Sequence, residues 1–371
     1  MEARPDIESL CCVNTECKHF AQIGKQDLKL RKTYGKDQIR YLRCTSCGEE
    51  FSERKGTALF NSKITESKAA SIIEHLDSGC GVVVTANLCR VAKDTVSRLV
   101  RLAGRTSRSI HFKLVRNLKP KALQFDEKWS YTTKKQKRVS ASDQQDQVGD
   151  HWDLNCIDPQ TKLLLTLIAG KRTAEMIHQA VEDAASRLAA DCSKPAIFTD
   201  GEPAYIDAIL SVFGHRYRVP HSGRRGRPHS AILRVPHELV YAQVIKHSQQ
   251  GEVKSVEIRP IFGKNKLQTI VGELGWTKAN TSAIERFNLT DRMRNSRKAR
   301  RTLCFSRRTR FHDWMSLISA VRYNFHHMHR SLRQAKDSGG WQKRTPAMAS
   351  GLVDHIYSTI ELLRLCPVGL G

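Results

Sequence analysis

The spacing of apolar and polar residues changes near residue 119, and this change divides the chain. Between residues 66 and 102, apolar residues recur every three or four positions, which is typical of amphipathic helices. Residues 122–132 instead alternate, and two further apolar runs, 151–158 and 161–170, are separated by a turn. Because alternation with a period of two suits a half-buried strand, the pattern predicts three consecutive strands.

A helix, a fourth strand and a second helix are predicted next. Residues 173 to about 190 have helical periodicity, and the apolar run 196–199 ends at Asp200. Gly201 supplies the break before a helix that begins near Glu202. Three strands, a helix, a strand and a helix are the order of an RNase H-like α/β domain, and ligand-handling groups of such sheets lie beyond the strand ends.

Four cysteines near the N-terminus form two close pairs. Four residues separate Cys12 from Cys17, and two separate Cys44 from Cys47. Zn²⁺ prefers thiolate ligands in tetrahedral geometry, and four thiolates repel one another unless a cation offsets their charge. The spacing predicts a structural zinc site in a small zinc ribbon. Cys11 adjoins Cys12, so the residues leave open which of the two is the first ligand.

The next segment is predicted to contain a helix-turn-helix. Apolar residues at helical spacing can pack inward, namely Ala86, Leu88, Val91, Val96, Leu99 and Val100. Polar neighbours would then face a DNA groove, namely Lys93, Asp94, Thr95, Ser97, Arg98 and Arg101. An ordinary helical hairpin has the same periodicity, but a zinc ribbon next to it on a basic chain favours DNA binding.

The composition indicates a polyanionic partner. The chain has 62 Lys and Arg residues against 37 Asp and Glu residues, a formal net charge of +25, which is typical of proteins that bind nucleic acid. No apolar run reaches the roughly 20 residues that span a membrane. The N-terminus does not resemble a signal peptide, so we expect a cytoplasmic, nucleoid-associated protein. Its 11 cysteines are then thiols or metal ligands rather than a disulfide framework.

Two basic segments are candidates for DNA contact. Arg225 and Arg227 belong to an Arg-Gly-Arg-Pro element, which matches short elements that enter the minor groove; a solvated surface loop is the alternative. Between residues 282 and 310, ten Lys or Arg residues, Arg297 and Arg301 among them, stand against two carboxylates. Such a density of positive charge favours contact with phosphate groups.

Three acidic residues are predicted to form one site. Asp126 lies in the first predicted strand, Asp200 follows the fourth, and Glu285 lies in a later helix. Two carboxylates about 4 Å apart repel by roughly 4 kcal/mol at an effective dielectric constant near 20, so a cluster of them implies bound cations. Two Mg²⁺ ions, or Mn²⁺ in their place, would activate the attacking oxygen and stabilise the leaving oxygen of a phosphodiester.

Each of these acids has an alternative. Asp200 can cap the helix that follows it. Glu285 can belong to a capping box that begins at Ser282, in which it would satisfy a backbone amide. Glu127 can also take part in the site, although adjacent residues of a strand point to opposite faces. The residue pattern alone leaves these roles open.

Several motifs resemble insertion-sequence DDE transposases of the IS-one group. They are FDE at 125–127, FTDG at 198–201, AIERFNLTDRMRNSRKARRTLCFS at 283–306, RCTSCGEEFSERKGT, YNFHHMHRSL and TPAMASGL. The resemblance implies that Asp126, Asp200 and Glu285 are the catalytic triad and the magnesium ligands. It implies DNA or supporting contacts for Arg286, Asn288 and Arg292. It also implies that the zinc ribbon and the helix-turn-helix bind terminal inverted repeats.

The resulting prediction is a DNA transposase that cleaves the ends of its element and transfers the 3′-hydroxyl ends to target DNA, as a homodimer or a higher oligomer. The alternative is a catalytically inactive zinc-ribbon and helix-turn-helix regulator. Between Asp200 and Glu285 lie 84 residues, more than in many DDE enzymes, and a β insertion would account for them.

The predicted fold has four parts in chain order. They are a zinc ribbon over 1–60, a helix-turn-helix domain over 61–112, an α/β RNase H-like catalytic domain over 119–335 with a β insertion over 215–265, and a C-terminal tail over 336–371.

Overall fold

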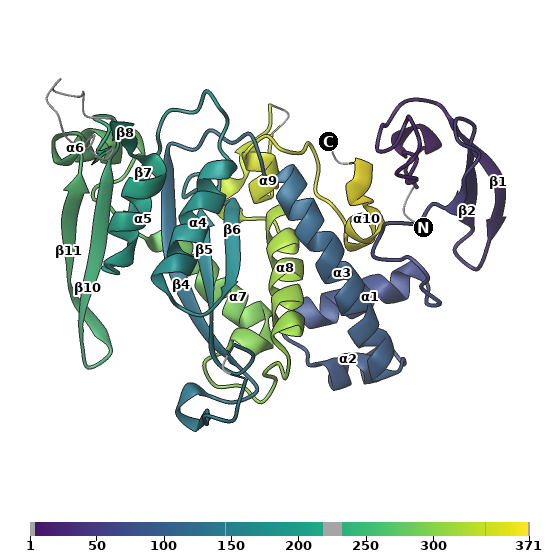
Figure 1. The fold of residues 1–371 in the computed structure, drawn as a ribbon, viewed down its shortest axis with the longest axis horizontal. Coiled ribbons are helices and arrows are strands. Elements are labelled where there is room, and N and C mark those ends of the chain that lie inside the picture. The colour runs from purple at the N-terminus through teal and green to yellow at the C-terminus, as the bar shows by residue number, and fades with distance from the viewer. Residues whose placement is uncertain (1–3, 145, 218–231, 338, 370–371) are drawn as a thin grey trace, which may run out of the picture. The chain divides into compact units, whose positions relative to one another are not determined.

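The computed structural model describes residues 4–144, 146–217, 232–337 and 339–369. The chain forms two compact units, each described here by itself (Figure 1). We call Met1–Val115 with Asp291–Gly371 the terminal unit, and Arg116–Thr290 the sheet unit.

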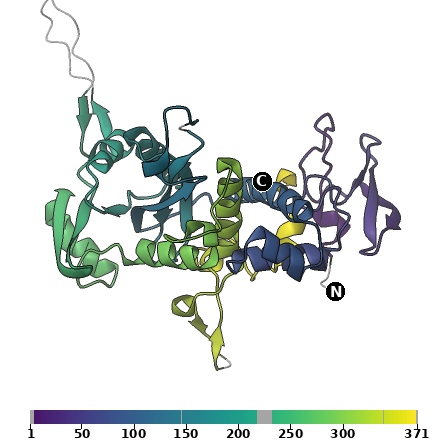
Figure 2. The ribbon, with the colours of Figure 1, turned by 90° about the horizontal axis from the view of Figure 1, so that it is seen from below.

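The terminal unit begins with a small antiparallel sheet and continues as helices. The sheet has the order β1-β2-β3, with β1 (Leu28–Tyr34), β2 (Ile39–Cys44) and β3 (Glu50–Ser52). The α-helices are α1 (Glu66–Asp77), α2 (Val82–Leu88), α3 (Lys93–Leu114), α8 (Thr309–Phe325), α9 (Pro346–Ala349) and α10 (Thr359–Arg364). A short hairpin of β12 (Gln334–Ala335) and β13 (Trp341–Gln342) projects from this unit (Figure 2).

One apolar core joins the first helices of the chain to a helix near its C-terminus. Leu76 of α1, Val100 of α3 and Ile318 of α8 belong to the same buried cluster. Helices α3 and α8 approach closely at Gly104, where an added Cβ atom would lie 2.8 Å from the Cα of Trp314. Glycine is therefore required there by the packing of two backbones.

The position of α8 corrects the predicted domain boundary. This helix was expected within the 119–335 domain, but it belongs to the terminal unit, and the sheet unit ends at Thr290. Nearly every residue of α8 from Met315 to Phe325 is buried, so the helix has no single apolar stripe. Periodicity therefore identified the helix but not the elements that it packs against.

Helices α2 and α3 are joined by a four-residue turn in which Arg90 has a φ of 51°. Of the residues predicted to pack inward, Ala86, Val96, Leu99 and Val100 are buried and Val91 packs against the same core. The expectation for Leu88 is wrong, because its side chain is 58% exposed. Residues two apart on a helix differ by about 200° in direction, so Ala86 and Leu88 cannot face the same core.

The sheet unit contains a six-stranded mixed sheet in the order β11-β10-β7-β4-β5-β6. Its strands are β4 (Ala122–Thr132), β5 (Gly149–Ile157), β6 (Leu164–Gly170), β7 (Ala196–Thr199), β10 (Tyr241–Gln249) and β11 (Glu252–Phe262). A separate pair consists of β8 (His215–Tyr217) and β9 (Ile232–Arg234). The helices are α4 (Ala174–Ser186), α5 (Ala204–Phe213), α6 (Lys264–Glu273) and α7 (Ser282–Arg294), of which α7 extends beyond Thr290.

The short strand β7 is parallel to both of its neighbours, β4 and β10. The other pairs, β4 with β5, β5 with β6 and β10 with β11, are antiparallel. The predicted order of three strands, a helix, a strand and a helix is confirmed, although α4 ends at Ser186 and not near residue 190. Helix α6 packs on one face through Leu267 and Val271, and Tyr205 of α5 contacts Phe125 on the opposite face.

The predicted β insertion over 215–265 is wrong in its main part. Its two long strands, β10 and β11, belong to the main sheet. The apolar run from Leu239 to Val244 is buried throughout, as expected for an inner parallel strand whose two faces are both covered. Only β8 and β9 lie outside this sheet, and residues 218–231 between them lie outside the described part of the chain.

Gly104→Ala should destabilise the terminal unit by about 1–3 kcal/mol, although alanine forms helices better than glycine, because the added methyl group overlaps α8. Gly272→Ala in α6 is the matched control, since an added Cβ there meets no atom within 4 Å. It should be neutral or stabilising by up to about 1 kcal/mol. Thermal unfolding of the two variants measures both effects, and equal melting temperatures would contradict the assigned contact between α3 and α8.

Candidate active site and metal centre

An acidic cavity lies where β7 ends. Strand β7 pairs with β4 only over residues 196–198 and with β10 only over 197–199. Both neighbours continue beyond this point, so a gap opens between them. A cavity of about 280 Å³ fills it, with a lining of Phe125, Asp126, Asp200, Gly201, Val244, Ile245, Lys246, Thr281 and Glu285. The three predicted acids therefore reach one cavity, which lies beyond the carboxyl end of a parallel strand.

Asp126 and Asp200 point to the same face of the sheet because each occupies an alternate position with buried core residues. Ala122 precedes Asp126 by four residues, Phe198 precedes Asp200 by two, and both belong to the core under α6. The Oδ1 of Asp200 also accepts a hydrogen bond of 3.0 Å from the backbone amide of Glu202. Asp200 thus makes the turn contact proposed as its alternative role while its carboxylate lines the cavity.

Glu285 reaches the cavity from the first turn of α7. Its Oε1 accepts a hydrogen bond of 2.6 Å from the Thr281 hydroxyl, and both of its carboxylate oxygens contact the Lys246 ammonium group. Ser282 is the first residue of α7 rather than the residue before it. The carboxylate of Glu285 is thus engaged by two side chains, which differs from the capping box considered as its alternative.

Glu127 joins the acidic group although it leaves β4 on the opposite face. Carboxylate oxygens of Asp126, Glu127 and Asp200 all lie within 4.8 Å of one another. The two faces of the sheet meet at this point because β7 has ended and no strand separates them. Arg172 balances part of the charge, with Nη2 at 3.4 Å from Glu127 and 2.5 Å from Glu202. Sequence reasoning named Glu127 only as an alternative, because the end of β7 decides the matter.

Burial and mutual repulsion raise the pKa values of these acids. Burial, followed by the charge of Asp200, raises the pKa of Asp126 to about 6. The same two causes raise the pKa of Glu127 to about 7. Burial also raises the pKa of Asp200. A group of carboxylates that is costly to ionise is suited to a divalent cation, which offsets both the desolvation and the repulsion.

Amide side chains hold Asp126 and α7 in register. The Nδ2 of Asn288 donates to Asp126 at 2.8 Å, and its Oδ1 accepts from Asn155 on β5 at 2.9 Å. The Oε1 of Gln124 accepts from the backbone amides of residues 283 and 284, and so satisfies the first turn of α7. Asn288 is only 2% exposed, so it supports the site rather than contacting DNA. Sequence reasoning missed Gln124 and Asn155, which no motif marks.

The other predicted DNA contacts differ in exposure. Arg286 and Arg301 are exposed, as are Lys93 and Arg98 on α3, whereas Arg292, Thr95 and Ser97 are half-buried. Arg98 also donates to the backbone oxygen of Asn61 at 3.1 Å. Arg225 and Arg227 lie outside the described residues.

The prediction for Arg297 is wrong in this structure. Its side chain is 5% exposed and its guanidinium group lies 5.1 Å from the ring centre of Phe311. Burial lowers the pKa of this guanidinium to about 10. A charged residue in a basic segment was expected to face solvent, but a cation over an aromatic ring can remain inside a protein.

The four predicted zinc ligands converge in the terminal unit. The Sγ atoms of Cys12, Cys17, Cys44 and Cys47 all lie within 4.8 Å of one another. Cys12 and Cys47 are 3.8 Å apart, and Cys17 and Cys44 are 3.9 Å apart. Tetrahedral zinc with Zn–S bonds of about 2.3 Å separates its sulfur ligands by about 3.8 Å, so this group could hold a structural zinc ion.

Local backbone geometry supports the sulfur cluster. Gly48 has a φ of 78°, which suits the tight turn after Cys47, and the Glu49 backbone amide lowers the pKa of the Cys47 thiol to about 7. Asp27 accepts hydrogen bonds from the Cys44 thiol at 3.4 Å. Cys11 is outside the cluster, and burial raises the pKa of its thiol to about 11. Cys12, and not Cys11, is therefore the first member of the sulfur set.

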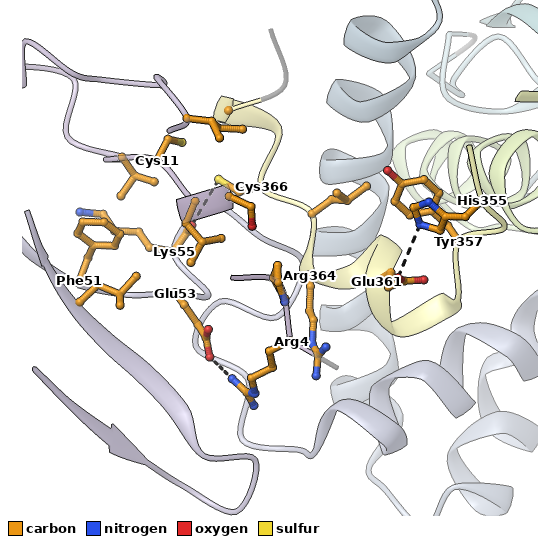
Figure 3. Close-up of a pocket in the computed structure, with 18 residues that line it drawn as sticks. Arg4, Cys11, Phe51, Glu53, Lys55, His355, Tyr357, Glu361, Arg364 and Cys366 are labelled. Atoms are coloured by element: carbon orange, nitrogen blue, oxygen red, sulfur yellow. Dashed lines mark hydrogen bonds and ion pairs between the residues drawn. The ribbon is translucent and has the colours of Figure 1, made fainter. Parts of the chain in front are cut away.

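A larger cavity, of about 510 Å³, lies between the N-terminal segment and the C-terminal segment of the terminal unit (Figure 3). Its lining includes apolar side chains such as Phe51, and charged side chains that pair with one another. Arg4 pairs with Glu53, and His355 lies 3.7 Å from Glu361. Because these charges are already paired, we assign the candidate site to the acidic cavity and not to this one.

Neither the comparison with protein-family models nor the comparison with curated proteins finds a match for this chain. Across the described part of the chain, the helices are too short or too polar for any of them to cross a membrane.

Cys12→Ser should lose the bound zinc, because it removes one of four converging thiols, whereas Cys11→Ser should keep one zinc ion per chain. Metal analysis of the purified proteins measures the difference. Cys44→Ser and Cys47→Ser should behave like Cys12→Ser and leave the sheet unit folded. Loss of zinc from Cys11→Ser together with its retention in Cys12→Ser would reverse the assignment.

Binding of Mg²⁺ or Mn²⁺ to the acidic cavity should strengthen between pH 6 and pH 8. The pKa values near 6 for Asp126 and near 7 for Glu127 mean that both acids bind protons increasingly below pH 7, and a cation must displace those protons. Calorimetry in buffers of different ionisation enthalpy should detect proton release on binding. An affinity that does not change over this range would show that these acids do not hold the cation.

Proposed function

We propose that this protein is a DNA transposase of the DDE type. It would bind the terminal inverted repeats of an insertion sequence, hydrolyse the phosphodiester at each end with Mg²⁺ or Mn²⁺, and transfer the 3′-hydroxyl ends to target DNA. The observation that carries the proposal is the convergence of Asp126, Asp200 and Glu285 on one cavity beyond the end of β7.

The order of the sheet supports an RNase H-like catalytic domain. Three antiparallel strands, β6, β5 and β4, are followed by β7 and β10, which run parallel to β4. Such a sheet brings residues of β4 and the end of β7 together, although 73 residues lie between Asp126 and Asp200 in the chain. We infer that this fold, rather than a generic mixed sheet, is the scaffold of the site.

The chain's own residues would prepare the site for a phosphodiester. Asn288 holds one oxygen of Asp126, so the other oxygen can face the cavity. The raised pKa values of Asp126 and Glu127 reflect repulsion that a bound cation relieves. Mg²⁺ bound by Asp126, Asp200 and Glu285, or with Glu127 in place of one of them, would polarise the phosphate and favour attack by water or by a 3′-hydroxyl group.

The terminal unit supports a role in DNA recognition. The sulfur cluster would hold a zinc ribbon together, and the turn between α2 and α3 has the length found in helix-turn-helix motifs. Lys93 and Arg98 are exposed on the first turns of α3, where a recognition helix contacts its groove. We infer that this unit selects the ends of the element, and that synapsis of two ends requires a homodimer or a higher oligomer.

Asp200→Asn should reduce end cleavage by at least about a hundredfold while leaving DNA binding intact, because it removes one cation ligand and leaves the terminal unit unchanged. The assay is Mg²⁺-dependent cleavage and joining of a labelled fragment that carries the inverted repeats flanking the gene. Asp207→Asn on α5 is the matched control, since Asp207 is absent from the residues that line the cavity, and it should retain cleavage.

Full cleavage by Asp200→Asn would contradict the site assignment. If the wild type binds the repeats but cleaves at no concentration of Mg²⁺ or Mn²⁺, the proposal fails in favour of a DNA-binding regulator. Cleavage without joined products would instead indicate a nuclease that lacks strand transfer.

A further inference from the structure

Lys246 occupies a special position on β10. The strand pairs with β7 through Gln243, and from Val244 onward it runs past the end of β7. Val244 belongs to the core under α6, so Lys246, two residues further, emerges on the same face of the strand. This is the face that carries Asp126 and Asp200, and Lys246 lines the same cavity.

The ammonium group of Lys246 is paired with a predicted cation ligand. It contacts both carboxylate oxygens of Glu285, one of which also accepts from Thr281. The pair is partly exposed, with 36% of the Lys246 side chain and 40% of the Glu285 side chain accessible. Ion pairs this exposed contribute little to stability and exchange partners readily. Lys246 therefore occupies, in the described structure, the carboxylate that a divalent cation would need.

We propose that Lys246 is a phosphate-binding residue of the catalytic cavity that is masked by Glu285 until a divalent cation is bound. When Glu285 becomes a cation ligand, its charge is shared and the ammonium group of Lys246 is released. The group then lies at the cavity that would hold the reacting phosphodiester, and it binds a phosphate oxygen of the DNA strand. This inference deepens the proposed function and rests on it.

A second cation near the acids shows why Lys246 fits this role. Arg172 is held by Glu127 and Glu202 and stacks against Trp152, with its guanidinium carbon 5.3 Å from the ring centre. Release of Arg172 would require several contacts to break. Lys246 is held by one carboxylate, and its long aliphatic stem allows the ammonium group to turn toward a new partner. One event, loss of the Glu285 contact, is sufficient to free it.

The first test measures cation binding without DNA. Lys246→Met removes the charge and keeps the length of the side chain, so it should tighten Mn²⁺ binding about two- to fivefold, which is the size of effect expected from a partly exposed pair. In a Glu285→Gln background the same substitution should have no effect. Lys254→Met is the matched control, because Lys254 lies on β11 of the same hairpin and pairs with Glu252 at 2.8 Å.

The second test measures binding of a DNA duplex that carries the inverted repeat, with Ca²⁺ in place of Mg²⁺ to prevent cleavage. In Ca²⁺, Lys246→Met should weaken binding and reduce the slope of log K against log salt concentration by about one unit, the effect of one phosphate contact. In EDTA the variant should bind as the wild type does, because Lys246 is then paired with Glu285.

Equal weakening of DNA binding in Ca²⁺ and in EDTA would overturn the masking, and an unchanged affinity in both would overturn the phosphate contact. Unchanged Mn²⁺ binding by Lys246→Met would show that the pair does not compete with a cation. The cation test uses neither DNA nor cleavage, so its result stands apart from the proposed function. Failure of the wild type to bind or cleave the repeats would count against the transposase alone.

Discussion

The mutual repulsion of Asp126, Glu127 and Asp200 is the constraint on which the sheet unit depends. Their carboxylate oxygens lie within 4.8 Å of one another, and burial adds a desolvation cost to the repulsion. The protein maintains this spacing with compensating contacts: Asn288 donates to Asp126, and Arg172 lies beside Glu127. These contacts reduce the cost without removing it, because the pKa values of Asp126 and Glu127 remain raised. The remaining cost is the driving force for cation binding.

The shortness of β7 gives this cluster its place. All four residues of the strand are buried, so it anchors the centre of the sheet, yet it ends before its neighbours do. The longer strands β4 and β10 then line a gap into which side chains from both faces of the sheet can reach. Gln124, one turn of the pleat before Asp126, binds the start of α7 and thereby fixes the position of Glu285. One strand thus positions two of the acids, one by its own residue and one through a helix.

The sequence predicted the residues whose role follows from local pattern. Asp126 and Asp200 follow from strand periodicity and a strand end, and the four cysteines follow from their spacing. Other features depend on contacts between distant segments. The place of Glu127 in the cluster required knowing where β7 ends, and β10 was misread because a continuous apolar run does not say which strand lies beside it. The burial of Arg297 against Phe311 could not be read from a basic segment, since composition does not distinguish a solvated cation from one that packs on a ring.

Net charge and local charge act at different ranges in this protein. The formal net charge of +25 would lower the pKa of every acid if it acted uniformly. The pKa values of Asp126 and Asp200 are raised instead, because charges more than about 10 Å away are screened at physiological salt and burial acts at contact. Only nearby cations can change the acids, and Arg172 and Lys246 are both already paired with carboxylates. The distant positive charge can therefore attract a polyanion to the molecule, while the chemistry of the cavity is governed by which partner each of these two cations holds.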